Sequence, residues 1–427
     1  MDIYVVKKGD SLGGIAARFG VSASLLAAQN GLVAEETLVI GQSLVVRYSE
    51  LLHTVEAGDT VYSVAKRYDI SVAELFQRNP ILGGQNRLYR GQTLVIRYAD
   101  EGQRSIGVNG YAYPFISEEL LDSVLPYMTY LTPFTYGIGA KGELVELGDE
   151  RLRAAAGYYR AATMMHLSSL TEEGRFSNER SSAVLRDEET QQTLVTAVIE
   201  TLQKKNFYAL DIDFEYVFPE ERELYAAFVR RLRETLNPLG YPVLAALAPK
   251  TDAMQRGLLY EAHDYRLLGA AANAVLLMTY EWGYTYGPPM AVAPLPQVRQ
   301  VLEYALSEIA PEKIFLGVPI YGYDWLLPYE QGVSRAESVS PEQALALARR
   351  YGAEISFDET AQSPYFRYVD RSGRQHEVWF EDARSLRAKL TLVEEFSLQG
   401  IGCWNLMRPF TQGWMLLTGV FRVEKLF

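Results

Sequence analysis

A short segment of alternating acidic and apolar residues carries the clearest chemical signal in this 427-residue chain. Residues 210–216 read Leu-Asp-Ile-Asp-Phe-Glu-Tyr, and successive side chains on a β-strand point to opposite faces. Asp211, Asp213 and Glu215 therefore share one face. Carboxylates spaced by about 7 Å on a buried face cannot all ionise cheaply, so at least one pKa must rise. A carboxyl that stays protonated near neutral pH can act as a general acid.

Other interpretations of these acids are an exposed acidic edge strand and a divalent-metal site. The edge strand is disfavoured because the opposite face is apolar and no basic residue interrupts the pattern. The acids alone do not dismiss a metal. However, the four His are scattered without ligand spacing, and the single Cys403 excludes a multi-cysteine site. We therefore expect no metal and no cofactor.

The elements that must position the acids form a regular series. Residues 105–427 alternate short apolar segments with amphipathic stretches, which predicts a (β/α)8 TIM barrel in the α/β class. A doubly wound sheet is disfavoured because no glycine-rich phosphate motif follows an early strand. Eight strands are expected, at residues 106–111, 130–136, 161–167, 208–216, 243–247, 274–280, 314–320 and 400–406.

The first part of the chain contains an internal repeat. Residues 6–12 return as 55–61, and 41–47 return as 91–97. The repeat defines two modules, residues 1–48 and 49–98, each expected to fold as strand, helix, helix, strand. Asp10 and Asp59 precede apolar stripes and are expected to cap the first helix of each module.

The repeated pattern resembles the LysM module, which binds glycans that contain N-acetylglucosamine, such as peptidoglycan and chitin. The resemblance implies that the sugar lies between the loop after the first strand and the segments after Asn30 and Asn79. Alternatively, the Gly and Asp residues serve only turn and cap geometry. The implied glycan-binding residues are Gly9, Asp10, Ser11, Leu12 and Asn30 in module 1, and Gly58, Asp59, Thr60, Val61 and Asn79 in module 2.

Residues 105–427 resemble family 18 glycoside hydrolases. The acidic segment is similar to the DxxDxDxE signature of that family, with Glu215 as the acid. Residues 277–282, 317–323 and 402–404 are similar to its strands six, seven and eight, and residues 325–385 resemble its small α+β insertion. The resemblance implies hydrolysis of a glycosidic bond inside a (β/α)8 barrel.

Four positions depart from the signature. Tyr208 stands where the first Asp falls, Ala209 replaces Gly, Phe214 replaces Trp, and Glu281 replaces Asp. The lost Asp removes one partner from the row of acids. Together with the tandem modules, these departures resemble the branch of cortex-lytic N-acetylglucosaminidases of bacterial spores. The resemblance implies cleavage of cortex peptidoglycan at the coat–cortex interface, without a cleavable signal peptide.

The family resemblance also implies roles, in a retaining mechanism assisted by the substrate. Glu215 would protonate the leaving oxygen and then activate water. Asp213 would hold the acetamido N–H of the sugar, and Asp211 would tune Asp213. Tyr280 would orient the acetamido oxygen. The implied substrate-binding residues are Glu281, Trp404, Tyr321 and Asp324.

Charge and hydropathy limit the partners. A formal net charge of −12 argues against nucleic acid. The longest mostly apolar run, residues 267–278, is shorter than the about 20 residues that span a bilayer. We expect a monomer that acts on an N-acetylglucosamine polymer away from membranes. A chitinase or chito-oligosaccharide hydrolase is one alternative, and a non-catalytic glycan-binding spore coat protein is a second.

Overall fold

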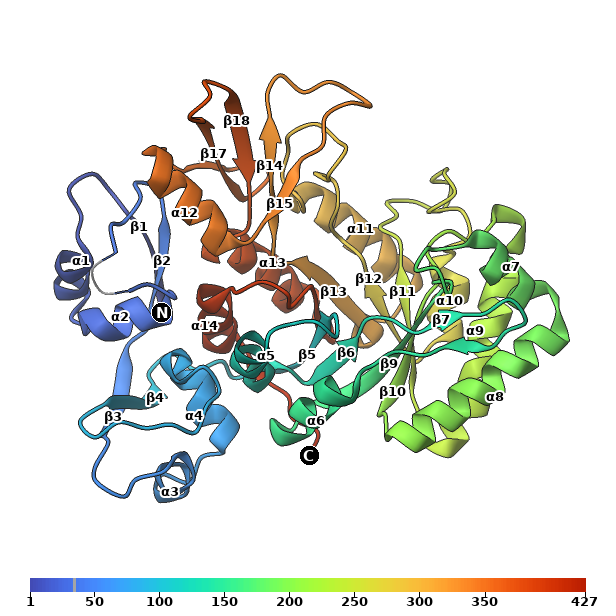
Figure 1. The fold of residues 1–427 in the computed structure, drawn as a ribbon, viewed down its shortest axis with the longest axis horizontal. Helices are drawn as coiled ribbons and strands as arrows, with labels where there is room; N and C mark the ends of the chain where they lie inside the picture. The colour runs from blue at the N-terminus through green and yellow to red at the C-terminus, as the bar shows by residue number, and fades with distance from the viewer. Residues whose placement is uncertain (34–35) are drawn as a thin grey trace.

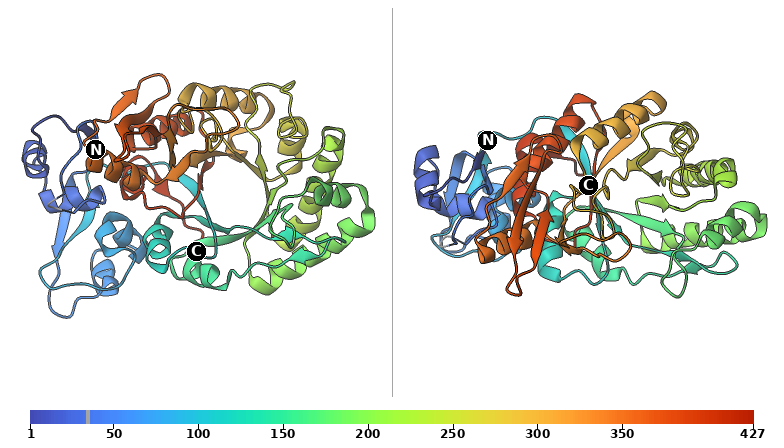
Figure 2. Two further views of the ribbon diagram at one scale, coloured as in Figure 1. Left: turned by 45° about the horizontal axis from the view of Figure 1, so that its top comes forward. Right: turned by 90° about the horizontal axis from the view of Figure 1, so that it is seen from above.

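The computed structural model describes residues 1–33 and 36–427. It contains two small N-terminal modules, a closed barrel and an antiparallel sheet inserted late in the barrel (Figure 1). The turned views in Figure 2 show helices ringing the barrel, with the modules on one side of it. Each part is built from the element types expected from its hydrophobic pattern.

Parallel strands form the barrel, and the last of them pairs with the first to close it. This closure confirms the TIM-barrel prediction. β20 (Arg422–Val423) adds to β5 at its beginning, and β7 (Gly137–Ile138) and β8 (Leu144–Val145) form a small hairpin. The barrel strands are β5 (Ser105–Ala112), β6 (Tyr130–Pro133), β9 (Ala162–Ser168), β10 (Ala209–Asp213), β11 (Val243–Leu247), β12 (Ala274–Leu277), β13 (Ile314–Pro319) and β19 (Gly400–Trp404).

Helices cover the outside of the barrel, and local sequence sets their ends. Asp187 caps α8 by accepting a hydrogen bond from the Thr190 amide at 2.7 Å. Asn206 ends α8 in the left-handed conformation. The covering helices are α5 (Glu118–Val124), α6 (Glu150–Tyr158), α7 (Asn178–Arg186), α8 (Glu188–Lys205), α9 (Arg222–Leu236), α10 (Tyr265–Ala271), α11 (Leu295–Glu308), α13 (Ala383–Glu395) and α14 (Thr411–Val420).

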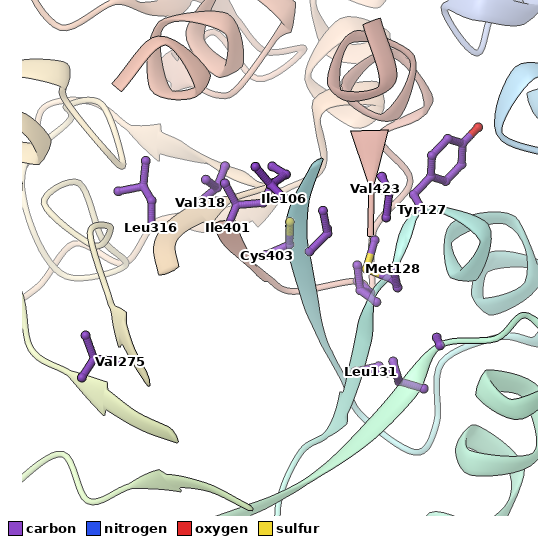
Figure 3. Close-up of a cluster of buried hydrophobic side chains, with 14 of the residues drawn as sticks. Ile106, Tyr127, Met128, Leu131, Val275, Leu316, Val318, Ile401, Cys403 and Val423 are labelled. Carbon is purple, nitrogen blue, oxygen red and sulfur yellow. The ribbon is translucent and has the colours of Figure 1, made fainter. Parts of the chain in front are cut away.

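Outward-facing strand residues make the main core. Ile106, Leu131, Val275 and Ile401 are buried side chains from different barrel strands (Figure 3). The chain end closes the bottom of the barrel, where Lys425 Nζ donates hydrogen bonds to three backbone carbonyls. The opposite end, at the carboxyl ends of the strands, is left for the site.

An antiparallel sheet interrupts the barrel between β13 and β19. Its strand order is β15-β14-β18-β17-β16, and α12 (Pro341–Tyr351) packs against it through a small core of its own. Its strands are β14 (Gly322–Leu326), β15 (Glu337–Val339), β16 (Ser356–Asp358), β17 (Ser363–Val369) and β18 (Gln375–Trp379).

Each N-terminal module contains two helices between two strands, and the strands pair antiparallel. Module 1 comprises β1 (Asp2–Val5), α1 (Leu12–Phe19), α2 (Ala23–Gln29) and β2 (Ser43–Val46). Module 2 comprises β3 (Ser49–Thr54), α3 (Val61–Arg67), α4 (Val72–Arg78) and β4 (Thr93–Tyr98).

The expected caps of the first helices are displaced by one residue. Ser11 and Thr60, not Asp10 and Asp59, are the N-caps of α1 and α3. Each Asp instead accepts a hydrogen bond at 2.8 Å from the backbone N–H three residues before it. The Asp therefore closes the preceding turn, and the next hydroxyl starts the helix.

Module 1 is packed firmly against the barrel and its inserted sheet. Gln412 Nε2 donates to Asn30 Oδ1 at 2.8 Å and to the Ser43 carbonyl at 2.7 Å. Arg47 is buried and bonds to Thr418 at 2.9 Å and to Asp100 at 3.4 Å. On the other side, the Ile355 amide donates to the Ile40 carbonyl at 2.9 Å. Module 1 is thus bonded to both α14 and the inserted sheet.

A matched pair of glycines tests this packing. Gly41 and Gly91 occupy the same repeat position with φ of 84° and 85°. A Cβ on Gly41 would overlap the backbone carbonyl of Ile355, whereas a Cβ on Gly91 meets nothing within 4 Å. Both Ala variants should lose about 1–2 kcal/mol from backbone strain. Gly41→Ala should lose more and should also expose the Ile355 amide to hydrogen exchange.

Thermal unfolding and hydrogen exchange measured by mass spectrometry check this prediction. Gly91→Ala is the control, because it carries the strain without the overlap. Equal protection of residues around Ile355 in the two variants would contradict the packing of module 1 on the inserted sheet.

Candidate active site

The three acids converge at the carboxyl end of β10. Asp211 and Asp213 are buried, and Glu215 is largely buried two residues beyond the strand. The strand ends earlier than residue 216, where the sequence placed its end. His263 Nε2 lies 3.2 Å from the Phe214 carbonyl and 3.0 Å from the Glu215 carbonyl, and it replaces the strand ladder there. Asp213 and Glu215 nevertheless face one cavity.

That cavity has a volume of about 780 Å³. It lies at the carboxyl ends of the barrel strands, where barrels of this kind place their chemistry. Its centre is lined by Asp213, Glu215, Tyr280, Glu281 and Trp404. The structure therefore brings together most of the residues singled out from the barrel sequence.

Burial changes the acidity of these carboxyls. Burial, together with the nearby Asp213 and Glu281 charges, raises the pKa of Glu215 to about 8. Burial raises the pKa of Asp213 to about 7 and also raises the pKa of Asp211. Within the described residues, no Lys or Arg forms a salt bridge with any of the three. Glu215 is therefore protonated at neutral pH and can supply a proton.

His166 and Tyr111 organise the acids from neighbouring strands, and sequence reasoning missed both. His166 stands in register with Asp211, and its Nε2 lies 3.5 Å from Asp213 Oδ2. Burial lowers the pKa of His166 to about 4, so the ring is neutral. Tyr111 donates a hydrogen bond to Asp211 Oδ2 at 2.8 Å. The alternation of residues 161–167 could have shown that His166 points inward.

Buried oxygens without a partner remain on both Asp residues. Asp211 Oδ1 and Asp213 Oδ1 accept no hydrogen bond from the protein. Buried polar atoms are normally satisfied, and Asp213 lines the cavity, so its carboxylate can accept a hydrogen bond from a ligand donor. An amide N–H on the substrate fits this acceptor.

Aromatic side chains shape the floor and one wall of the cavity. Trp404 packs against Phe134, with ring centroids 4.9 Å apart, and against Tyr111 at 5.7 Å. Glu281 accepts hydrogen bonds from the hydroxyls of Tyr321 and Tyr323. Trp404 therefore presents a supported ring face of the kind on which sugars stack.

Asp324 points away from the cavity, whereas Asp211 and Tyr321, which do not line it either, bond to groups around it. Asp324 accepts a hydrogen bond from Tyr368 at 2.6 Å and lies 2.9 Å from His376 Nδ1. Side chains alternate along β14, so Tyr323 faces Glu281 while Asp324 faces the core of the inserted sheet. Asp324 is a structural residue of that sheet and does not line the cavity.

The glycan-binding candidates of the modules divide into exposed and structural groups. Gly9 and Ser11 are exposed, as are Gly58 and Thr60, whereas Asp10 and Asp59 are only partly exposed. Leu12 and Val61 are core residues. Some of the segment after Asn30, residues 34–35, lies outside the described residues.

Asn30 and Asn79 are buried and fully hydrogen-bonded within their modules. They are only 5% and 2% exposed. Each donates to two backbone carbonyls at 2.8 Å and accepts from a strand amide at 2.7 Å. These bonds satisfy the amide group and tie the second helix of each module to its closing strand.

Metal ligands and membrane-spanning helices were both considered for residues 1–33 and 36–427, and neither is found there. No group of three or more His, Cys, Asp or Glu side chains there could hold a metal ion. No helix in those ranges is long and apolar enough to cross a bilayer.

The raised pKa of Glu215 predicts a pH-dependent stability effect. Because the folded state disfavours ionised Glu215, stability is lost as pH rises from the ordinary Glu range towards about 8. Glu215→Gln should therefore raise Tm at pH 8 by about 2–4 °C and leave it nearly unchanged at pH 4. Thermal unfolding across pH tests this, with the exposed Glu234→Gln on α9 as the control. The same Tm gain at both pH values would contradict the prediction.

Comparison with known proteins agrees with this geometry. The LysM domain model matches residues 4–47 and 53–97. The chain is 40% identical over its full length to the cortical fragment-lytic enzyme of Bacillus subtilis (strain 168), covering 99% of that protein. The crystal structure of the Bacillus cereus spore cortex-lytic enzyme SleL superposes with a TM-score of 0.84 at 37% identity, covering 99% of this chain and 98% of that one.

A chitinase from Chromobacterium violaceum aligns with 74% of this chain and 99% of its own, at 25% identity and a TM-score of 0.68. The family model for glycosyl hydrolases family 18 matches residues 163–408, more than half of the chain. The chain therefore belongs to glycosyl hydrolase family 18 and is a glycoside hydrolase that carries two LysM domains.

Proposed function

We propose that this glycosidase cleaves the glycosidic bond of N-acetylglucosamine in the peptidoglycan of bacterial spore cortex. Its likeness to the Bacillus subtilis and Bacillus cereus cortex enzymes extends over both modules and the barrel. The observation that carries the chemistry is the placement of Glu215 beside Asp213 in one cavity, where burial raises the pKa of Glu215. This arrangement favours substrate assistance, in which the sugar supplies the nucleophile.

The proposed first step breaks the bond between the anomeric carbon and the bridging oxygen. Glu215 transfers its proton to that oxygen, while the acetamido oxygen of the same sugar attacks the anomeric carbon. A cyclic oxazolinium ion forms, and the leaving chain departs as an alcohol. Asp213 Oδ1 accepts the acetamido N–H and balances the positive charge, and Tyr280 orients the acetamido oxygen.

Water completes the reaction from the side that the leaving group vacated. Glu215, now ionised, takes a proton from the water as it adds to the anomeric carbon. The ring opens back to the acetamido group, and the configuration is retained. His166 and Tyr111 act as positioning residues, because they hold Asp211 and Asp213 from neighbouring strands.

The modules would hold the enzyme on the insoluble substrate of the spore, with one chain acting as a monomer. The glycan would contact the exposed loops at Gly9 and Ser11, and at Gly58 and Thr60. In module 2, Tyr89 on the segment after Asn79 is 58% exposed, with Arg87 over its ring, and could contact the glycan as well.

A chitinase is the second candidate, and the fold similarity to the Chromobacterium violaceum chitinase favours it. That similarity covers 74% of the chain rather than all of it. A non-catalytic coat protein is disfavoured because Glu215 is present, buried and protonated.

Glu215→Gln should lower kcat on cortex fragments by about 10³-fold, since Gln cannot transfer the proton. The measurement is the release of new reducing ends from purified cortex, vegetative wall and chitin in parallel. Mass spectrometry of the products identifies the bond cleaved. Glu234→Gln should behave as wild type. Undiminished release by Glu215→Gln would remove the acid assignment, and preferential cleavage of chitin would favour the second candidate.

Tyr89→Ser should weaken retention on insoluble peptidoglycan roughly fivefold, the effect of losing about 1 kcal/mol of ring contact. Sedimentation with the polymer measures retention, and turnover of a short soluble oligosaccharide shows that the barrel is intact. Val369→Ser, an exposed apolar position on the inserted sheet, is the control. Equal retention of the Tyr89 and Val369 variants would argue against anchoring through this part of module 2.

A further inference from the structure

The active-site cavity continues past Trp404 into a second cavity of about 550 Å³, and the two together are called the groove. Glu281 and Trp404 line both cavities, so the two adjoin. The second cavity is walled by Tyr113 and Phe115 on one side, and by Tyr323 and Arg408. None of the catalytic steps above uses Tyr113, Phe115 or Arg408.

An aromatic platform lines this second cavity. Tyr113 and Phe115 stack with ring centroids 5.2 Å apart, and Tyr113 lies 6.2 Å from Trp404. Phe115 is 78% exposed, so the stacked pair presents an apolar surface to the cavity. The Trp404 ring and this pair offer two successive surfaces, as neighbouring sugars of one chain would require.

Arg408 places a cation beside that platform. Its guanidinium donates to Gln343 Oε1 at 3.1 Å and to Ser338 Oγ at 3.0 Å, and both partners are neutral. The salt bridges among the described residues include no carboxylate partner for Arg408. By contrast, Arg367 and Arg384 each pair with a carboxylate. Arg408 is only partly exposed. Its bonds to Gln343 and Ser338 leave several of its five N–H donors unused.

A half-buried guanidinium without a counter-ion suits an anionic ligand, because charge-assisted bonds to carboxylate offset its lost hydration. A chain made only of N-acetylglucosamine carries no carboxylate. Peptidoglycan does, because its muramic sugars bear a lactyl group whose carboxyl can be free or extended by an acidic peptide. The groove therefore contains a feature that matches one of the two polymers and not the other.

We propose that Arg408 is a specificity-determining residue that binds a carboxylate on the sugar next to the one seated on Trp404. This inference rests on the proposed function, since it assigns the substrate class as a carboxylate-bearing muramic glycan. The carboxylate comes from the lactyl group itself or from the attached peptide. Both sources present the same chemistry to the guanidinium.

Binding to the Glu215→Gln protein tests the proposal without turnover. Calorimetry would compare four tetrasaccharides: a muramic glycan with free lactyl carboxylates, one with attached peptides, the first after amidation of its carboxyls, and chitotetraose. Glu215→Gln should bind a carboxylate-bearing glycan at least about tenfold more tightly than the amidated one. The glycan that shows the preference identifies the source of the carboxylate.

Adding Arg408→Gln should abolish that preference without changing the affinity for chitotetraose. Arg408→Lys, which keeps the charge but loses the planar fork, should restore part of it. An equal loss of affinity for all four glycans would mean that Arg408 only supports the groove wall. No preference in the Glu215→Gln protein would also overturn the proposal.

The proposed function and the role of Arg408 can be disproved independently of each other. If wild-type enzyme released no product from cortex while the Glu215→Gln protein still preferred carboxylate-bearing glycans, the assignment of Arg408 would stand and the cortex assignment would fall. The reverse result, cleavage of cortex without any carboxylate preference, would leave the function in place and remove Arg408 from recognition.

Discussion

The structure depends on a closed barrel that buries three carboxyl groups without a cationic partner. Asp211, Asp213 and Glu215 lie together where burial disfavours their charge. A Lys or Arg beside them would stabilise the ionised forms and remove the acidic proton. Neighbouring barrel strands provide His166 and the neutral Tyr111, which orient Asp211 and Asp213 without neutralising them. The site thus keeps a transferable proton at the expense of local stability.

Much of the barrel and its acids could be predicted because both follow from period-two alternation. One pattern placed Asp211, Asp213 and Glu215 on a common face and identified strands that the structure confirms as a closed ring. The end of β10 could not be predicted in the same way. It is set by His263, which is distant in sequence and reaches the Phe214 and Glu215 carbonyls.

Residues whose roles come from tertiary contacts were the ones that sequence reasoning misplaced or missed. Asn30 and Asn79 have the same side chain as a ligand-binding amide, and only their bonds to helix and strand show that they are structural. Asp324 could be placed on a strand, but which face of that strand looked into the groove could not be known. Nothing in the sequence singled out Arg408, because the absence of a carboxylate partner can be recognised only once its neighbours in space are known.

Module 1 is joined to α14 and to the inserted sheet by direct bonds at Gln412, Arg47 and Ile355. A binding domain on a flexible tether lets its enzyme sample a volume set by tether length. Here the bonds of module 1 to α14 and the inserted sheet replace such a tether, and they would set the distance between a glycan bound by module 1 and the catalytic cavity. While module 1 stays bound to a glycan network, the catalytic cavity would therefore reach only strands at that distance. Cleavage of other strands would require release and rebinding.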